Sequence, residues 1–277
     1  MKMFFAILSA CLFSLITLGQ QDSILHVTKV QTLTGGFKDF STDNLGNIYL
    51  LTATNQLKKV NEKGDSMAVY NDVRRYGKIN SVDAANPLKV LVYYKDFSTV
   101  VVLDRLLNVR AAIDLRKQNI FQVTAITSSY DNNIWLYDEL DSKLKKIDDN
   151  GNVLLESTDF RQIFDSVPSP SVMYDRDGLL YLYDARKGLM VFDYYGGKKN
   201  NYQLLHLSDL QVIDKNTITA RDSIHIILFK PATFQLLSYK AFREQNRFIK
   251  INFNGSRIYC LTKDGEVEIY SSLENKF

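Results

Sequence analysis

The sequence has few of the residues on which disulfide-rich, metal-binding or low-complexity proteins depend. Its 277 residues include two cysteines, four prolines, 13 glycines and three histidines. So few prolines and glycines exclude a long structureless linker. The cysteines are Cys11, inside an N-terminal apolar run, and Cys260, so a framework of several disulfides is excluded. Cys260 lies in the apolar run "RIYCLT", and we interpret it as a small buried side chain.

An excess of charge of one sign is also lacking. The 34 basic and 31 acidic residues leave a formal net charge of +3 at pH 7. So small an excess does not create the field that nucleic-acid binding usually requires, and we predict no nucleic-acid partner.

The N-terminus carries the one long apolar run. "MKMFFAILSACLFSLITLG" has a basic head at Lys2, an apolar stretch and small residues near its end, which is typical of a secretory signal peptide. We predict a signal peptide over residues 1–19, cleaved after Gly19, and a mature domain over residues 20–277. The run is shorter than a typical membrane anchor, so we do not expect the protein to span a membrane. "LSAC", ending at Cys11, resembles a lipobox, but the apolar run continues beyond it and we do not expect a lipoprotein.

Helical periodicity is absent after residue 20, and a repeated phrase takes its place. Each copy has an apolar run rich in β-branched and aromatic residues, a short polar turn and a second such run. The copies are "IYLLTATNQLKKVN", "VLVYYKDFSTVVVLD", "IWLYDELDSKLKKID", "LYLYDARKGLMVFD", "IHIILFKPATFQLLS" and "IYCLTKDGEVEIYS". They begin at Ile48, Val90, Ile134, Leu180, Ile224 and Ile258. A period near forty residues indicates the blades of a β-propeller.

Turn residues divide each unit further. "DNLGN", "YDNN", "YDRDG" and "FNG" precede four of the phrases, and "NEKG", "DDNG" and "YYGG" follow three of them. Asp, Asn and Gly accept the positive φ of tight hairpins, so each unit should hold four strands. The sixth unit ends before a fourth strand, but "SILHVTKVQTL" from Ser23 can supply it. We therefore predict an all-β, six-bladed β-propeller of four-stranded blades, closed by the N-terminal strand. A β-sandwich is the alternative, but it does not explain six repeats.

The phrase from Asp43 to Leu50 has the form D-x-x-G-x-I/L-Y-L. It resembles the propellers of the NHL type and of the YWTD type found in the low-density-lipoprotein receptor. The second and fifth units lack the glycine turn, and no unit has a full YWTD. The "LGQQ" that follows the apolar run and the Asn-, Lys- and Tyr-rich chain are similar to exported proteins of the Bacteroidota. That resemblance implies a periplasmic protein and, by analogy, a component or plug of the type IX secretion translocon.

Candidate catalytic residues are scattered among the units. The histidines, placed in the repeat, fall in a strand of the closing blade (His26), an outer strand (His206) and a central strand (His225), with no metal-ligand spacing between them. Calcium-dependent propeller lactonases, which this fold suggests, need acids and amides that converge on the axis. The candidates on inner strands are Asp39, Asp83, Asp175 and Asn252. Such residues also cap turns, and we favour that interpretation, so we predict no catalytic residue, metal or cofactor. We interpret the aromatics that recur in register as core between blades: Tyr49, Trp135, Tyr181 and Tyr259.

Three longer connections combine Arg with aromatic residues, the composition of protein-interface anchors. They are "NDVRRYGK" (71–78), "LRKQNIFQ" (115–122) and "DFRQIFDSVPSPS" (159–171). From them we predict the interface residues Arg74, Arg75, Tyr76, Phe121, Arg161 and Phe164. The favoured function is an exported, non-enzymatic module that binds a protein partner in an outer-membrane or periplasmic complex. The alternatives are a propeller hydrolase or lactonase, with calcium, and a carbohydrate-binding module.

Overall fold

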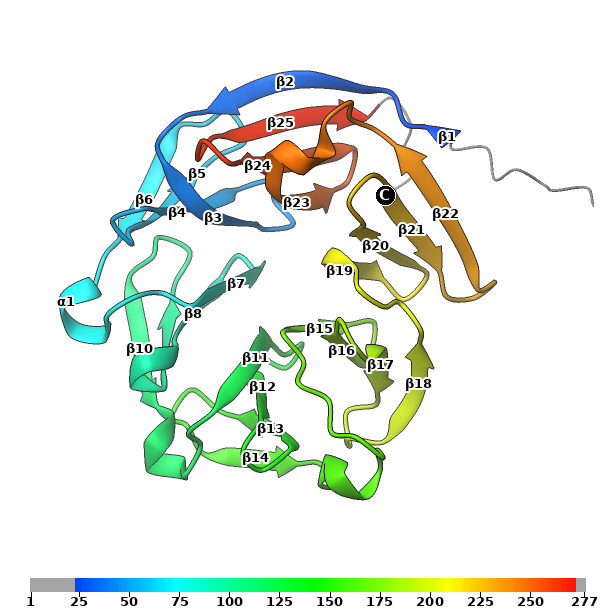
Figure 1. The fold of residues 1–277 in the computed structure, drawn as a ribbon. Helices are drawn as coiled ribbons and strands as arrows, with labels where there is room; N and C mark the ends of the chain where they lie inside the picture. Colours follow the sequence, from blue (N-terminus) through cyan, green and yellow to red (C-terminus); the bar gives the residue numbers. More distant parts are fainter. Residues whose placement is uncertain (1–22, 273–277) are drawn as a thin grey trace, which may run out of the picture.

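Six β-sheets stand as blades around a central axis in the computed structural model (Figure 1). The structure describes residues 23–272. The prediction of an all-β, six-bladed propeller with four-stranded blades is confirmed. The predicted signal peptide of residues 1–19, including Cys11, lies outside the described residues. Among residues 23–272, no helix is long and apolar enough to cross a membrane.

Each of the first four blades is a meander of four consecutive strands, the first nearest the axis. Blade 1 has β3 (Phe37–Thr42), β4 (Ile48–Thr52), β5 (Leu57–Val60) and β6 (Ser66–Tyr70). Blade 2 has β7 (Ser81–Asn86), β8 (Lys89–Tyr94), β9 (Thr99–Leu103) and β10 (Val109–Asp114). Blade 3 has β11 (Val123–Ser128), β12 (Ile134–Asp138), β13 (Lys143–Ile147) and β14 (Val153–Glu156). Blade 4 has β15 (Val172–Arg176), β16 (Leu179–Asp184), β17 (Gly188–Phe192) and β18 (Lys198–Tyr202).

The last two blades also take strands from the N-terminus. Blade 5 has β19 (Ser208–Asp214), β20 (Thr217–Arg221), β21 (Ile226–Lys230), β22 (Gln235–Lys240) and, outermost, β1 (Ser23–Ile24). Blade 6 has β23 (Phe248–Asn254), β24 (Arg257–Thr262), β25 (Val267–Ser272) and β2 (Val27–Leu33). Short helices lie in the loops: α1 (Val73–Tyr76), η1 (Lys95–Phe97), η2 (Leu115–Gln118), η3 (Phe160–Gln162) and η4 (Gln245–Arg247).

The N-terminal closure is confirmed and extends further than predicted. β2 pairs antiparallel with β25, from Val27 opposite Ser272 to Leu33 opposite Val267. Figure 1 shows β2 beside the C-terminal β25 on the rim of the ring. β1 then crosses to the neighbouring blade and pairs parallel with β22, which makes blade 5 five-stranded. Leu25, between the two strands, is buried in the core where blades 5 and 6 meet. The N-terminal segment therefore joins two blades.

The core lies between the blades. The middle strands are buried along their whole length, as in β4, β8, β12 and β17, because both faces of a blade pack against neighbours. The prediction for the in-register aromatics is confirmed, since these side chains are all buried: Tyr49, Trp135, Tyr181 and Tyr259. Cys260 is also fully buried, and burial raises the pKa of its thiol well above its ordinary value.

The turns between third and fourth strands of blades 1 to 4 share one hydrogen-bonding pattern. An Asp or Asn side chain accepts hydrogen bonds from the backbone N–H groups two and four residues later, starting at Asn61, Asp104, Asp148 and Asp193. The residue three positions on has a positive φ, which Gly151 adopts without the steric cost of a side chain. The predicted turns after the third strand are thus confirmed. Blade 2 has the same turn without a glycine, because Leu107 adopts the positive φ at that position.

The prediction for the fifth unit was wrong by one strand. The sequence predicts the run from Ile224 as its central strand, but Thr217–Arg221 is the second strand and Ile226–Lys230 the third. None of the three histidines lies in a strand: His26 falls between β1 and β2, His206 in the loop after β18, and His225 just before β21. The more apolar of two adjacent strands had been mistaken for the more central one, although Thr219 in the true second strand is fully buried.

Candidate functional site

The two ends of the propeller differ in their connections. All inner strands run in the same direction, so the links between blades and the turns between second and third strands share one end. We call this end the upper face, and the end that carries the other turns the lower face. The predicted connections 71–78, 115–122 and 159–171 are the links from blade 1 to 2, from 2 to 3 and from 3 to 4. All three therefore lie on the upper face.

A pocket of about 380 Å³ lies at the axis, where the inner strands meet. Three of the four predicted inner-strand residues line it, namely Asp39, Asp83 and Asn252, together with Asp209 and Lys250. Asp175 also lies on an inner strand, as predicted, but does not line the pocket. Within residues 23–272, no group of three or more His, Cys, Asp or Glu side chains is placed to hold a metal ion.

The inner acids bind neighbouring blades. Asp83 in blade 2 accepts hydrogen bonds from the Thr127 hydroxyl (3.0 Å) and the Ser128 N–H (2.6 Å) in blade 3. Asp175 in blade 4 accepts from the Ser129 hydroxyl in blade 3 (3.0 Å) and from the Tyr194 hydroxyl (2.6 Å). Both carboxylates therefore hold inner strands together, and hydrogen bonds of this kind are needed wherever polar groups are buried.

The junction of blades 6 and 1 is held in the same way. The Lys250 ammonium lies 2.7 Å from an Asp39 oxygen and also donates to the Phe40 carbonyl (2.8 Å). The Asn252 amide oxygen accepts from the Thr42 hydroxyl (2.9 Å). At the junction of blades 5 and 6, Asp209 accepts from the Ile251 N–H (2.8 Å) and pairs with Arg221. The interpretation of these residues as turn caps holds for Asp83, which accepts from its own Ala85 N–H (2.9 Å). Their other contacts described above reach across to a neighbouring blade, which the sequence analysis did not predict.

The first connection places two cations on the surface and one aromatic ring beneath them. In α1, Arg74 and Arg75 are exposed, and the Arg75 guanidinium lies over the Tyr76 ring, 4.9 Å from its centre. Tyr76 is only 8% exposed and packs against Tyr94. Tyr76 is thus positioned to hold α1 on the core, and its ring is not available to a partner.

The second connection presents Phe121. Asp114 accepts a hydrogen bond from the Arg116 N–H (3.1 Å) and pairs with its guanidinium, which fixes the start of η2. Leu115 is buried beneath this turn, whereas Phe121 is 51% exposed. The Ser98 hydroxyl donates to the Phe121 carbonyl (3.2 Å), so this link is tied to the turn of blade 2.

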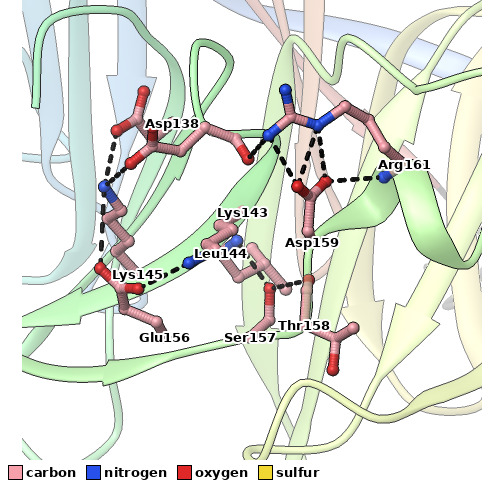
Figure 2. Close-up of polar contacts among 10 residues, drawn as sticks. Asp138, Lys143, Leu144, Lys145, Glu156, Ser157, Thr158, Asp159 and Arg161 are labelled. Carbon is pink, nitrogen blue, oxygen red and sulfur yellow. Dashed lines mark hydrogen bonds and ion pairs between the residues drawn. The ribbon is translucent and has the colours of Figure 1, made fainter.

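The third connection presents Arg161 in a fixed orientation, as Figure 2 shows. Its guanidinium donates through Nε to Asp159 Oδ1 (2.9 Å) and through Nη2 to Oδ2 (2.6 Å), and it also reaches the Asp141 carbonyl (3.2 Å). These hydrogen bonds hold the pKa of the Asp159 carboxyl below its ordinary value. Phe164 is half-buried against Phe160, with the Lys198 ammonium over its ring. Arg161 is therefore already paired, unlike Arg74 and Arg75.

Sequence reasoning missed several exposed apolar side chains of the upper face, among them Phe97 and Leu140. Phe97 is 42% exposed in the turn of blade 2, and Leu140 is exposed in the corresponding turn of blade 3. The signal was an apolar residue inside a hairpin turn, in "KDFS" and "ELDS". A second omission lies on the lower face, where exposed Tyr130 stacks on Tyr194.

Comparison with known proteins supports the architecture. No protein-family model and no curated protein matches the chain. Its structure is similar to the WD40 domain of Pan2 from Neurospora crassa, with 10% identity, a TM-score of 0.64, and 90% of this chain and 96% of that one covered. It is also similar to a virginiamycin B lyase from Staphylococcus aureus solved with quinupristin, with 11% identity, a TM-score of 0.61, and 89% and 98% covered. A third similar structure is a streptogramin B lyase, with 12% identity and a TM-score of 0.59; the match covers 84% of this chain and 78% of that one. The chain has a propeller fold. At these identities the likeness concerns the fold alone.

Proposed function

We propose that this protein is a non-enzymatic interaction module whose upper face binds a protein partner. The observation that carries the proposal is the contrast between the axis and the upper face. On the inner strands around the axis, Asp83 and Asp175 are occupied by hydrogen bonds between blades. On the upper face, Arg74 and Arg75 are exposed beside exposed aromatic side chains, the residue types that dominate binding energy at interfaces.

The finer proposal concerns location and partner. We propose that the protein is exported to the periplasm, where it joins an outer-membrane or periplasmic complex as a component or plug of the type IX secretion translocon. The support for this is the N-terminal "MKMFFAILSACLFSLITLG", and the "LGQQ" ending and Asn-, Lys- and Tyr-rich composition that resemble exported proteins of the Bacteroidota. A rigid disc held together by side chains between blades suits such a role, because little of its surface must be ordered on binding.

A hydrolase or lyase is the second candidate, and the axial pocket favours it. Its volume of about 380 Å³ suits a small molecule. Asp39, Asp83 and Asp209 line it, and carboxylates can act as general acids or bases. Each of the three already accepts a hydrogen bond, so catalysis would require a substrate to displace Lys250 from Asp39 or an equivalent rearrangement.

Substitutions on the two surfaces separate these functions. Replacing Arg75 or Phe121 by Ala should lower the affinity for the native partner by about thirtyfold, because loss of an interface anchor costs about 2 kcal/mol. Both side chains are exposed, so the melting temperature should not change. Partner recovery from the host envelope, quantified by mass spectrometry, measures the effect.

The matched controls are the inner acids. Asp39→Asn and Asp83→Asn keep the shape of the side chain and should leave partner recovery unchanged. If these variants abolish recovery while Arg75→Ala and Phe121→Ala do not, the upper face is not the binding surface. Hydrolysis of a lactone or ester that disappears with the same acids would favour the enzyme.

Export has its own test. The mature protein from the native host should begin at Gln20, because the apolar run ends in the small residues that signal peptidases require. Intact-mass analysis of protein from the periplasmic fraction measures this, and the cytoplasmic fraction is the control. A mass that includes Met1 would show that the protein is not processed.

A further inference from the structure

The upper face carries a local excess of positive charge. The segments 71–78, 95–98 and 115–122 contain six basic and two acidic side chains. The basic ones are Arg74, Arg75, Lys78, Lys95, Arg116 and Lys117. Of these six, only Arg116 forms an ion pair within residues 23–272, with Asp114. We call these three segments the cationic strip.

The excess is confined to this part of the face. The neighbouring segments 139–142 and 157–171 contain four acidic side chains and one basic one, Arg161, which is already paired with Asp159. The protein as a whole has a net charge of only +3. A positive strip beside a negative region therefore gives this face a preferred orientation for a charged partner.

Exposed aromatic rings lie within the strip. Phe97 lies against Gly77, the residue that ends α1: a Cβ on this glycine would be 3.3 Å from the Phe97 ring. Phe121 is joined to the same turn of blade 2, since its carbonyl accepts from the Ser98 hydroxyl. The Phe97 ring thus lies beside the end of α1, Phe121 follows η2, and both are exposed, so the strip combines charge with apolar surface.

A lysine below the strip is affected by the same field. The pKa of Lys38 is lowered, first by burial and then by the positive charge of Lys78. The Lys38 ammonium donates to the Asn55 side-chain oxygen (2.5 Å), which also accepts from the Ile79 N–H (3.2 Å). The Lys78 ammonium of the strip is therefore close enough to Lys38 for the two charges to repel each other.

We propose that the cationic strip binds an acidic segment of the partner protein, with aromatic or aliphatic residues that pack on Phe97 and Phe121. This inference rests on the proposed function and specifies the chemistry of the partner. Acidic side chains on that segment would neutralise Arg74 and Arg75, and attraction at a distance would speed its encounter with the strip. Apolar anchors would cover rings that are otherwise in water.

Charge reversal tests the electrostatic half of the proposal. The double variant Arg74→Glu with Arg75→Glu should lower partner affinity by about thirtyfold or more, whereas Arg74→Lys with Arg75→Lys should retain most of it. The matched control is Arg186→Glu with Lys187→Glu, which makes the same charge change on the upper face of blade 4 and should have little effect. Binding by the wild type should weaken as salt is raised, because salt screens exposed charges.

Photo-crosslinking identifies the bound segment. A photoreactive amino acid in place of Phe121, in protein purified from its own host, should crosslink to a partner segment with net negative charge. The same amino acid in place of Ile249, which is exposed on blade 6, is the control. A basic or uncharged segment, or an equal effect of the Arg186 and Lys187 control, would overturn the inference while a recovered partner still supports the proposed function. Recovery of no partner by the wild type would overturn both.

A membrane surface is the competing occupant of a cationic, aromatic strip. Vesicles of phosphatidylglycerol and phosphatidylcholine provide the probe, with vesicles of phosphatidylcholine alone as the control. Sedimentation with the anionic vesicles that is lost on reversing Arg74 and Arg75, without a crosslinked acidic segment, would show that the strip binds lipid and would overturn the proposal.

Discussion

Deleting residues 23–33 should destroy the closed ring. This segment supplies the outer strand of blade 6, through six paired residues of β2, and the fifth strand of blade 5. Its removal exposes the edge of β25 and the apolar residues beneath Leu25, at the junction of blades 5 and 6. We expect the free energy of unfolding to fall by about 5 kcal/mol or more, which is comparable to the whole unfolding free energy of an ordinary domain. The free edge should also promote aggregation.

Urea unfolding and size-exclusion chromatography measure these effects. Leu25→Ala removes only the buried side chain of this segment and should lower the free energy of unfolding by about 2–5 kcal/mol, because Leu25 is fully buried. Val30→Lys is the control: Val30 is in β2 but 56% exposed, so the change should stay within about 0.5 kcal/mol. A truncated chain that melts like the intact mature protein would show that the N-terminal strand does not close the ring.

Replacing Lys145 by Ala should cause the second largest loss of stability. The Lys145 ammonium lies 2.8 Å from an Asp138 oxygen and 2.5 Å from an Asp141 oxygen. Figure 2 shows it between the carboxylates of Asp138 and Glu156. The Lys145 and Asp138 side chains are only 3% and 1% exposed. Removing one partner leaves the other charge buried without compensation, which costs about 3–5 kcal/mol. Chemical denaturation measures the difference, with Lys143→Ala as the control, because the Lys143 pair with Glu156 is partly exposed and worth less than about 1 kcal/mol.

The pH dependence of stability distinguishes a charged Lys145 from a merely packed one. Burial acts to lower its pKa, but the hydrogen bonds and charges of Asp138 and Asp141 outweigh it and raise the pKa above the ordinary 10.5. Its contribution is therefore complete below pH 10.5 and is lost as the pH rises through the folded-state value. The stability gap between wild type and Lys145→Met should narrow in that range. A constant gap would mean that the lysine stabilises the blade by packing alone.

Much of the fold could be predicted because the propeller repeats a local pattern. Turns such as Asp148–Gly151 need particular residues, and buried strands need apolar ones, so both appear at regular intervals in the sequence. The fifth unit does not follow this pattern. Thr219 is fully buried in its second strand, and its polar hydroxyl concealed that position. Likewise, Leu107 occupies a turn position with positive φ, where a glycine would have indicated the turn in the sequence.

The candidate site could be predicted only in part. Composition pointed to the connections that contain Arg75, Phe121 and Arg161, and the topology brings all three to one face. Composition could not show that Tyr76 is buried or that Arg161 is already paired with Asp159. Phe97 escaped notice because it lies in a short turn, outside the long connections.

The sequence by itself determined the six-fold repeat and the three long connections, because each is a pattern of residues close together in the chain. It also determined the closure by the N-terminal strand, because the sixth unit holds only three strands and needs a fourth. Tertiary structure alone decided which charges are free. Arg74 and Arg161 cannot be told apart in the sequence, but in the part of the chain that the structure describes a carboxylate lies within hydrogen-bonding distance of Arg161 and not of Arg74. The inner acids are the same case, since Asp83 meets Thr127 only where two blades pack. Asp83 and Thr127 are 44 positions apart in sequence, so local pattern carries no signal for their contact. Asp72 and Asp159 each stand two positions before their arginine, so only the folded backbone decides which arginine is paired.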